Sequence, residues 1–406
     1  MLRWMFFDLN SYFASVEQHD RPELRGRPVV VSPVDTNTTS AIAASYEAKR
    51  FGIKTGTNIG EARLLCPDVQ IVLARPQRYV EVHKQVVEAV ESCLHVDGIH
   101  SIDEVSCRLM GSERQPERAV ELAKKVKRTI VKRVGECLRC SVGLAPNRWL
   151  AKVATDMQKP DGLVILNESD LPHALYRLKP MDLPGIGSRM NKRLLSHGIT
   201  TVRQICELSE ADMKRIWHSV VGSNWWHWLR GFETYEKPTQ RRTLGHSHVL
   251  PPKHRTIEGA KAVLVRLTHK AAARLRSIGY WASRMAAHIS YGRDSGDWRC
   301  DLPLGLAQDT LTMVESLTQA WDRKPLPRGT PMKVSITFYN LTEQRQVIEP
   351  LFPQERNRLD LSRAMDQVNS KFGRNAIYLA AMHEARNTGR TGIAFNYVPE
   401  FNPEFS

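Results

Sequence analysis

The chain has 406 residues, of which 42% are hydrophobic, and this length predicts three or four packed units rather than one core. The formal charge of +15 favours a polyanionic partner, because Lys and Arg gain free energy by displacing counterions from phosphates. No run of about 18 apolar residues occurs, the apolar start is too short for a signal peptide, and no lipidation motif is present, so a membrane partner is not expected. Seven cysteines without framework spacing indicate a reducing compartment.

Strands and helices are predicted to alternate over the first part of the chain. Apolar residues recur at helical spacing at Val82, Val86, Val90 and Cys93, for example. This alternation predicts an α+β or α/β core of roughly 165 residues. In chain order we expect a strand at 1–9, a helix at 11–17, a strand at 28–32, a helix at 79–94, a strand or tight hairpin at 102–105, a helix at 119–130, a strand at 140–144, a helix at 147–157 and a turn at 159–162.

The second half of the chain changes character twice. Residues 166–233 are predicted to be helical, and residues 234–243 are polar, basic and Pro-containing, as in a linker. Beyond the linker we expect strand, helix, strand, strand, helix and strand, which form a second α+β domain. Its first helix carries apolar residues at 260, 264, 267 and 271, and its last strand alternates at 334, 336 and 338. A tail with its own helix pattern follows residue 344.

Three carboxylates follow predicted strands: Asp8, Asp103 and Glu104. Gathered at neighbouring strand ends, they would form a patch of negative charge that needs a cation. Mg²⁺ suits such a patch because it prefers hard oxygen ligands and shares its shell with phosphates. Taken singly, each carboxylate fits a helix cap or a solvated turn equally well.

Cations and hydroxyl groups cluster in three further segments, 46–52, 147–152 and 159–162. A bound triphosphate needs such donors around it. The alternative for each segment is an ordinary solvated basic face.

Taken together and in order, these motifs resemble the Y-family of translesion DNA polymerases, close to bacterial DNA polymerase IV and the catalytic subunit of DNA polymerase V. The resemblance covers about residues 1–345 and implies an α+β multidomain right-hand polymerase. The matching segments are 7–17, 46–52, 101–104, 142–147, 152–162 and 183–187. The implied domains are palm (1–10 and 76–165), small fingers (11–75), helical thumb (166–233), linker (234–243), little finger (244–343) and C-terminal tail (344–406).

The resemblance also implies roles for individual residues. Asp8, Asp103 and Glu104 would hold two Mg²⁺ ions, with Mn²⁺ as a substitute, and the Leu9 carbonyl would add a ligand. Phe13 would be a steric gate that collides with a 2′-hydroxyl. The expected nucleotide-binding residues are Phe13, Tyr12, Tyr46, Lys49 and Lys159.

Two features of the sequence qualify these roles. Phe13 and Tyr12 fit a role as core aromatics as well. Lys49 stands where the family usually has Arg, which keeps the charge but loses the bidentate fork, so nucleotide affinity or positioning is in question.

The segment 183–187 resembles a helix–hairpin–helix, in which Gly185 and Gly187 let backbone N–H groups approach a DNA phosphate without reading sequence. The helix that follows carries Arg189, Lys192 and Arg193. The alternative is an ordinary glycine turn. In the little finger and the linker before it, the candidate phosphate contacts are Arg241, Arg242, Lys253, Arg255 and Arg284.

Two short segments carry weaker expectations. Small side chains at 43–45 would leave room for a distorted template base, or would simply allow close helix packing. The run 346–352 sits where related enzymes carry a sliding-clamp peptide, with Gln346, Leu351 and Phe352 as the binding residues. Its alternative is a strand end that packs on its own domain.

These expectations lead to a template-directed DNA polymerase that adds deoxynucleotides to a primer 3′ end, with low fidelity, in DNA repair and the SOS response. The expected partners are primer-template DNA, deoxynucleoside triphosphates and a sliding clamp, and we expect a cytoplasmic, nucleoid-associated monomer. A non-catalytic polymerase-like adaptor and a nucleotidyl cyclase with a similar palm are the alternatives. Retention of the carboxylates, Phe13 and Lys159 argues against the first, and the glycine hairpin with the basic second domain against the second.

Overall fold

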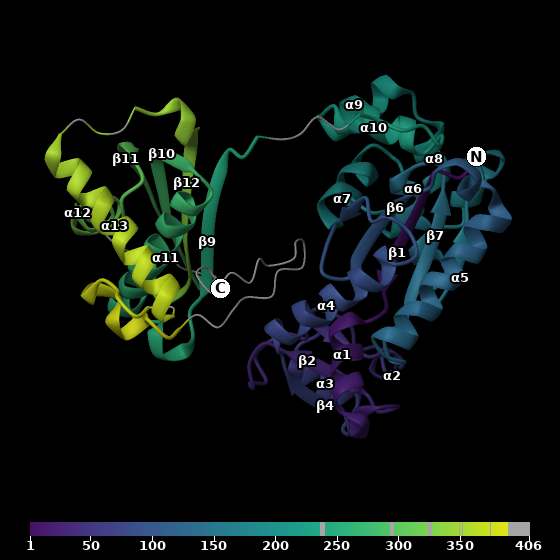
Figure 1. Ribbon diagram of the computed structural model, residues 1–406, viewed down its shortest axis with the longest axis horizontal. Coiled ribbons are helices and arrows are strands. Elements are labelled where there is room, and N and C mark those ends of the chain that lie inside the picture. Colours follow the sequence, from purple (N-terminus) through teal and green to yellow (C-terminus); the bar gives the residue numbers. More distant parts are fainter. Residues whose placement is uncertain are drawn as a thin grey trace. The chain divides into compact units, whose positions relative to one another are not determined.

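The computed structural model describes residues 1–235, 240–292, 296–323, 327–348, 350, 352–373 and 375–388. These residues form two compact units (Figure 1). Unit 1 contains the residues up to 235, and unit 2 contains those from 240 onward. None of the helices in these ranges is both long enough and apolar enough to span a membrane.

A five-stranded sheet in the order β5-β6-β1-β7-β8 lies at the centre of unit 1. All six residues of the central strand β1 are buried. Side chains alternate along a strand, so Trp4, Phe6 and Asp8 share one face of the sheet. Trp4 and Phe6 pack in one core with apolar residues of helix α6, so Asp8 lies on the α6 side. The strands are β1 (Trp4–Leu9), β5 (Gly98–Ile99), β6 (Glu104–Arg108), β7 (Cys140–Ala145) and β8 (Leu163–Ile165).

Helix α6 (Arg148–Met157) lies very close to strand β7. It begins at the N-cap residue Asn147, whose side chain accepts a hydrogen bond from the Leu150 amide at 2.8 Å. A Cβ atom on Gly143 of β7 would lie 2.0 Å from the Ala151 carbonyl, so only glycine fits there. Helix α5 (Pro116–Arg133) packs against β7 and against α4 (Pro76–Glu91).

A three-stranded sheet in the order β3-β2-β4 and helices α2 and α3 form a separate small core in unit 1, and α1 packs against β2 and β3. Ala44 and Ser45 are each 1% exposed. Ser45 is the N-cap of α2 and accepts hydrogen bonds from the Val29 and Ala48 amides. The small residues here therefore pack closely. The elements are α1 (Tyr12–Asp20), β2 (Val29–Ser32), β3 (Ala43–Ala44), α2 (Tyr46–Lys49), α3 (Ile59–Leu65) and β4 (Gln70–Leu73).

The helical segment after β8 shares its hydrophobic core with the central sheet. Leu150 and Ala154 of α6 belong to the same buried cluster as Leu175 and Trp225. The residues expected to form palm and thumb are thus continuous in packing, and the proposed boundary between them stays a prediction. The α-helices are α7 (Ser188–Ser196), α8 (Val202–Glu207), α9 (Glu210–Trp217) and α10 (Val221–Trp228).

Unit 2 has a four-stranded antiparallel sheet, in the order β11-β10-β12-β9, against which α11 and α12 pack. Val334, Ile336 and Phe338 of β12 are fully buried, as their alternation predicts. α13 packs against α12 and follows the sheet in the chain. The elements are β9 (Thr243–Val249), α11 (Ile257–Ser277), β10 (Tyr280–Tyr291), β11 (Trp298–Ala307), α12 (Thr310–Arg323), β12 (Pro331–Glu343) and α13 (Pro353–Phe372).

The order of elements expected from the sequence is confirmed for the long helices and strands, including the six elements of unit 2. The strand expected at 102–105 begins only at Glu104, since residues 101–103 form a bend. The short elements β3, β4, α3 and β5 were not predicted, because two to seven residues carry too little periodicity.

Candidate active site

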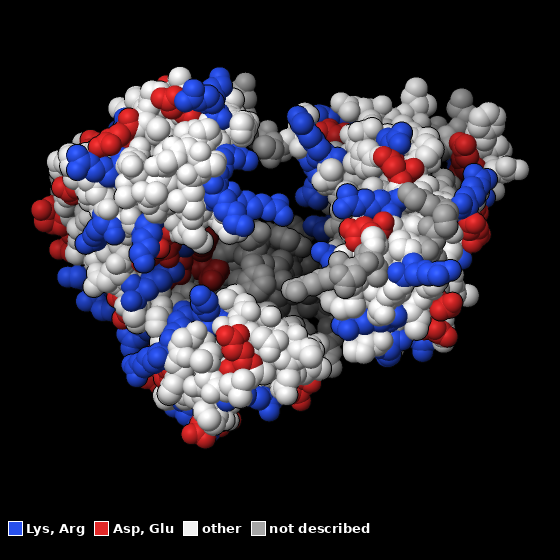
Figure 2. Space-filling model, turned by 180° about the vertical axis from the view of Figure 1, so that it is seen from behind, with Lys and Arg blue, Asp and Glu red and all other residues white. Residues whose placement is uncertain are grey.

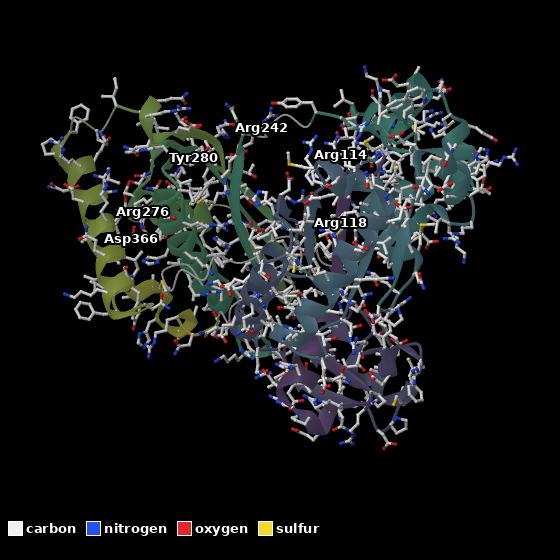
Figure 3. The ribbon with its side chains drawn as sticks, turned by 45° about the vertical axis from the view of Figure 1, so that its right-hand side comes forward. Arg114, Arg118, Arg242, Arg276, Tyr280 and Asp366 are labelled. Carbon is white, nitrogen blue, oxygen red and sulfur yellow. The ribbon has the colours of Figure 1, made fainter. Side chains whose placement is uncertain are left out.

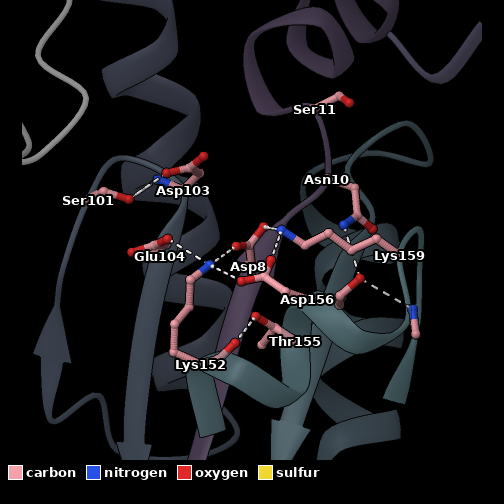
Figure 4. A network of polar contacts seen from close by, with 12 residues as sticks. Asp8, Asn10, Ser11, Ser101, Asp103, Glu104, Lys152, Thr155, Asp156 and Lys159 are labelled. Atoms are coloured by element: carbon pink, nitrogen blue, oxygen red, sulfur yellow. Dashed lines mark hydrogen bonds and ion pairs between the residues drawn. The ribbon is translucent and has the colours of Figure 1, made fainter. Parts of the chain in front are cut away.

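Asp8 and Glu104 face each other across the strand pair β1–β6, and one lysine contacts both. They are directly opposite in the antiparallel register. Lys152 of α6 contacts the Asp8 carboxylate, and its Nζ lies 2.8 Å from Glu104 Oε1 (Figure 4). Opposed like charges destabilise a strand pair, so this ammonium group holds the two strands' carboxylates together.

A second lysine and a third carboxylate complete this network. Lys159 Nζ lies 2.8 Å from Asp8 Oδ1 and 2.7 Å from Asp156 Oδ1. Lys152 Nζ lies 3.5 Å from Asp156 Oδ2, four residues along the same helix. Burial opposes the charge of both lysines, but the carboxylates, above all Asp8, outweigh it and raise the pKa of Lys152 and Lys159. Both ammonium groups are therefore fully charged at neutral pH.

Asp103 is next to this network in the chain but its carboxylate turns elsewhere. The Ser101 hydroxyl donates a hydrogen bond to it, and Figure 4 draws Asp103 apart from the point where Asp8 and Glu104 meet. Burial, with smaller contributions from Asp8 and Glu104, raises the pKa of Asp103 to about 6. The expected gathering of three carboxylates is thus incomplete: two converge on Lys152, and the part of the chain described here holds no group of three His, Cys, Asp or Glu side chains arranged to bind a metal.

The turn after β1 is tightly fixed. The Leu9 amide donates to the Asp103 carbonyl at 2.9 Å. The Asn10 side chain donates to Ser141 at 3.0 Å and accepts from the Asp161 amide at 2.8 Å. Ser11 adopts a left-handed backbone with φ 48°, which costs a non-glycine residue of order 1 kcal/mol. Such strain often marks a functional turn.

The residues expected to hold a triphosphate lie together beside Asp8. Lys49 Nζ donates to Ser11 Oγ at 2.8 Å and lies 4.3 Å from the centre of the Tyr46 ring. Desolvation, with the nearby Lys159 charge, lowers the pKa of Lys49. Desolvation raises the pKa of Tyr46, whose hydroxyl is also influenced by Lys159 and Asp8. Two groups of α2, Tyr46 and Lys49, and Lys159 from a distant segment therefore lie near Asp8.

Phe13 lies on α1 and is 4% exposed. Its ring stacks on Tyr79 with centroids 4.5 Å apart and planes 24° apart. The Tyr12 hydroxyl donates to the Tyr79 carbonyl at 2.6 Å, and burial raises the pKa of Tyr12 well above its usual value. Both rings are thus buried: the Tyr12 hydroxyl is bound to the Tyr79 backbone, and the Phe13 ring lies flat against the Tyr79 ring.

A cavity of about 570 Å³ is lined in part by Glu104 and Lys152. Its floor is the β1–β6 face, where Trp4 pairs with Arg108 four residue pairs away from Asp8 and Glu104. Glu233 closes one end by accepting hydrogen bonds from Trp4 at 2.5 Å and Arg108 at 3.3 Å. Arg148 and Trp149 also line the cavity. Aromatic faces and cations thus lead directly to the carboxylates.

The glycine hairpin is present in the helical segment. Gly185 has φ +101°, and a Cβ atom there would lie 3.2 Å from the Trp225 ring. Gly187 is the N-cap of α7 with an open surrounding. Arg189 and Lys192 are exposed on α7, whereas Arg193 donates to the carbonyls of residues 216 and 217. Arg193 therefore stabilises the fold, and the other two cations stay available.

The cations expected to contact DNA in unit 2 divide into two groups. Arg255 donates to the Leu250 carbonyl at 3.0 Å, and Arg284 forms an ion pair with Asp301 at 2.8 Å. The others are exposed, namely Arg241, Arg242 and Lys253. Lys and Arg side chains are scattered over both units on the face that Figure 2 shows, so exposure alone singles out none of them.

The candidate clamp segment lies between β12 and α13. Gln346 is exposed at the end of a short 3₁₀ turn, and Phe352 is 70% exposed. Leu351 and Glu349 lie outside the described residues. β12 ends at Glu343. Ile348 is 88% exposed, whereas Val347 and Pro350 are half-buried, so the described residues leave both the clamp peptide and packing on its own domain open.

Sequence reasoning left two members of the network without a role. Lys152 was seen only as part of a basic segment, and Asp156 was not singled out. Both lie on one face of α6 at a spacing of four residues, with opposite charges, which is a detectable pattern. Only their contact with Asp8, 144 residues away from Lys152, distinguishes them from a surface ion pair.

Comparison with known proteins identifies the family of this chain. Residues 7–156 match the impB/mucB/samB family, and residues 241–349 match the C-terminal domain of that family. DNA polymerase IV of Moorella thermoacetica is 32% identical over 387 residues, covering 92% of this chain and 94% of the relative. DNA polymerase IV of Bacillus velezensis is 26% identical, covering 96% and 95%.

Solved structures show the same fold. A Y-family DNA polymerase chimera based on Dbh has a TM-score of 0.69 at 22% identity, covering 84% of this chain and 99% of the chimera. The insertion ternary complex of Dbh DNA polymerase has a TM-score of 0.55 at 24% identity, with the same two coverages. The chain therefore belongs to the Y-family of DNA polymerases, the impB/mucB/samB family, and is a DNA-directed DNA polymerase similar to DNA polymerase IV.

Proposed function

We propose that this polymerase extends a primer 3′ end on damaged template DNA by phosphoryl transfer at Asp8, Asp103 and Glu104. The observation that carries the proposal is the pairing of Asp8 with Glu104 at the strand ends, where a cationic group bridges them. Catalysis at such a site consists mainly of positioning and electrostatic stabilisation.

The donor set fits divalent cations. Carboxylate oxygens are the ligands Mg²⁺ prefers, and the position of the Lys152 ammonium indicates that Asp8 and Glu104 accept a cation between them. Asp103 would join them by turning its side chain from Ser101, and the Leu9 carbonyl would add an oxygen. When bound, two such ions would stabilise the negative charge that develops during phosphoryl transfer; Mn²⁺ is the expected substitute.

The nucleotide would lie on the side of Asp8 that carries Tyr46, Lys49 and Lys159. These groups supply a hydroxyl and two ammonium donors for phosphate oxygens. Phe13 would stack under the sugar and exclude a 2′-hydroxyl, giving a preference for deoxyribonucleotides. Lys49, lacking the fork of Arg, would position the triphosphate less rigidly.

The primer would approach through the cavity floored by Trp4 and Phe6. Base and sugar would contact these rings, and Arg108 and Arg148 are cations of the kind that bind backbone phosphates.

Gly185 and Gly187 would contact the DNA backbone further along, together with the exposed Arg241 and Arg242. Gln346, Leu351 and Phe352 would bind a sliding clamp.

A primer-extension assay with Mg²⁺ tests the proposal. We expect wild type to extend a primer, and Asp103→Ala to lose extension while it still binds primer-template DNA. The matched control is Asp97→Ala, an exposed carboxylate six residues earlier, which should extend normally. Extension by the Asp103→Ala protein would refute the metal assignment, and failure of wild type to extend would favour a DNA-binding adaptor.

A further inference from the structure

One lysine occupies the place where two carboxylates of the proposed metal site meet. Lys152 is a partly buried cation, with 18% of its side chain exposed, and its Nζ contacts Asp8 and Glu104 at once. Asp8 itself has 8% of its side chain exposed. Two carboxylates this close need a cation at all times, because uncompensated buried charges are strongly unfavourable.

A divalent cation at Asp8 and Glu104 would lie within a few ångströms of this ammonium group. The two positive charges would repel each other in a partly buried site, where solvent screens them poorly. Lys152 must therefore move when the cation binds. In its new position the Lys152 ammonium group also needs an acceptor, because burying an unpaired ammonium is as unfavourable as burying unpaired carboxylates.

Asp156 is that acceptor. Its Oδ2 lies 3.5 Å from Lys152 Nζ, and the two residues are one helical turn apart on α6, so the change needs rotation of side-chain bonds alone. Figure 4 shows Asp156 beside the lysines, on α6 and away from Glu104. Asp156 also fixes Lys159 at 2.7 Å, so it holds both cations that contact Asp8.

We propose that Lys152 is a displaceable internal counter-ion that competes with divalent cations for Asp8 and Glu104, and that Asp156 is the position to which it moves. Lys152 and Asp156 are thus positioning residues. The inference rests on the proposed metal site, and it adds that the affinity of that site for metal is set by these two residues of α6.

The test measures Mn²⁺ binding to the full-length protein without DNA or nucleotide, from the electron paramagnetic resonance signal of free Mn²⁺. Lys152→Met keeps the length of the side chain but removes its charge. We expect it to bind Mn²⁺ about tenfold more tightly, the middle of the range for coupled charged neighbours. Equal or weaker binding would overturn the proposal. Lys152→Gln serves for the same measurement if circular dichroism shows that Lys152→Met does not fold.

The role of Asp156 is tested by a double-mutant cycle. Asp156→Asn should weaken Mn²⁺ binding several-fold in the wild-type background, because Lys152 then has no second acceptor, and should have much less effect in the Lys152→Met background. An equal effect in both backgrounds would mean that Asp156 acts on the metal only through its negative charge. That result would overturn its assignment as the acceptor of Lys152. The matched control is Asp161→Asn, which removes a carboxylate that pairs with Lys127 and should change neither affinity nor coupling.

A further variant separates this inference from the proposed function. Asp8→Asn should abolish Mn²⁺ binding. If it does not, the metal site itself is wrong and both proposals fall. If Asp8→Asn abolishes binding while Lys152→Met leaves it unchanged, the metal site stands and only the counter-ion role of Lys152 is refuted.

Discussion

Phe13 stacks on Tyr79, and Tyr79 is in turn fixed by a buried carboxylate. The Tyr79 hydroxyl donates to Glu17 at 2.7 Å, and the Arg75 Nε–H is shared between both oxygens of the fully buried Glu17 carboxylate, at 3.0 and 3.1 Å. A satisfied buried network of this kind is rigid, because each member holds the next. The Phe13 ring is therefore supported from behind.

Sugar selection should depend on this ring. We predict that Phe13→Ala raises ribonucleotide incorporation relative to deoxyribonucleotide incorporation by at least about tenfold, because the shape that rejects the 2′-hydroxyl is removed. Single-nucleotide incorporation kinetics with matched ribo- and deoxyribonucleotides measure the ratio. Tyr12→Phe is the control, since Tyr12 bonds the Tyr79 backbone instead, and its ratio should stay unchanged. An unchanged ratio in Phe13→Ala would remove it as the gate.

Helix α6 lies so close to β7 that a single methyl group at Gly143 should disrupt their packing. In Gly143→Ala the new Cβ would meet the Ala151 carbonyl, a backbone atom that cannot rotate away. We predict a loss of about 3 kcal/mol in the free energy of unfolding and a fall in extension activity, because α6 carries Lys152. Urea unfolding and primer extension measure the two effects. Gly187→Ala, which has open space and an ordinary φ of −86°, should cost less than about 1 kcal/mol.

Stability at mildly acid pH should depend on His269 of α11. Burial, with a smaller contribution from Arg276, lowers the pKa of His269 to about 4, while the unfolded chain titrates near pH 6.5. Between these values the unfolded state binds more protons, so stability falls as the pH falls from about 6.5 to 4 and levels off below. The loss from this residue is about 3 kcal/mol at most.

The variant His269→Gln removes this titration and should flatten the pH dependence in that window. The measurement is urea unfolding at several pH values, with hydrogen exchange in α11 peptides as the readout for unit 2. It gives the slope of the free energy of unfolding against pH. Other histidines contribute equally to both proteins, so the difference isolates His269. Identical slopes would show that the folded protein protonates His269 near its ordinary pKa.

The attachment of α13 to unit 2 should depend on one ion pair. Arg276 of α11 forms two parallel hydrogen bonds to Asp366 of α13 at 2.6 and 2.8 Å, and only 6% of the Arg276 side chain is exposed (Figure 3). We predict that Asp366→Asn destabilises α13 by about 2 kcal/mol, because a buried guanidinium loses its charged acceptor. Hydrogen exchange in α13 peptides should rise accordingly.

The control for that prediction is Asp360→Asn, an exposed carboxylate on the same helix whose nearest Arg363 nitrogen lies 3.7 Å away. This variant should change the free energy of opening of α13, measured by hydrogen exchange, by less than about 0.5 kcal/mol. Equal protection of α13 in the Asp366→Asn protein would mean that apolar packing alone holds the helix.

The sequence by itself determined the family and the order of the long elements, and it singled out the carboxylates of the proposed metal site. These follow from local information: the ordered motifs from 7–17 to 183–187, the helical spacing of α4 and α5, and the alternation in β12. Local patterns persist in the fold because each is a requirement of one helix or strand.

Only the tertiary structure decided how the site is neutralised. It brought Lys152 to Asp8 and Glu104, set Asp156 beside it, turned Asp103 toward Ser101, and used Arg193 and Arg255 as structural hydrogen-bond donors. No spacing in the chain encodes these relationships. They arise because sheet register and the close packing of α6 on β7 bring together charges far apart in sequence, and a buried charge takes whichever partner lies within reach.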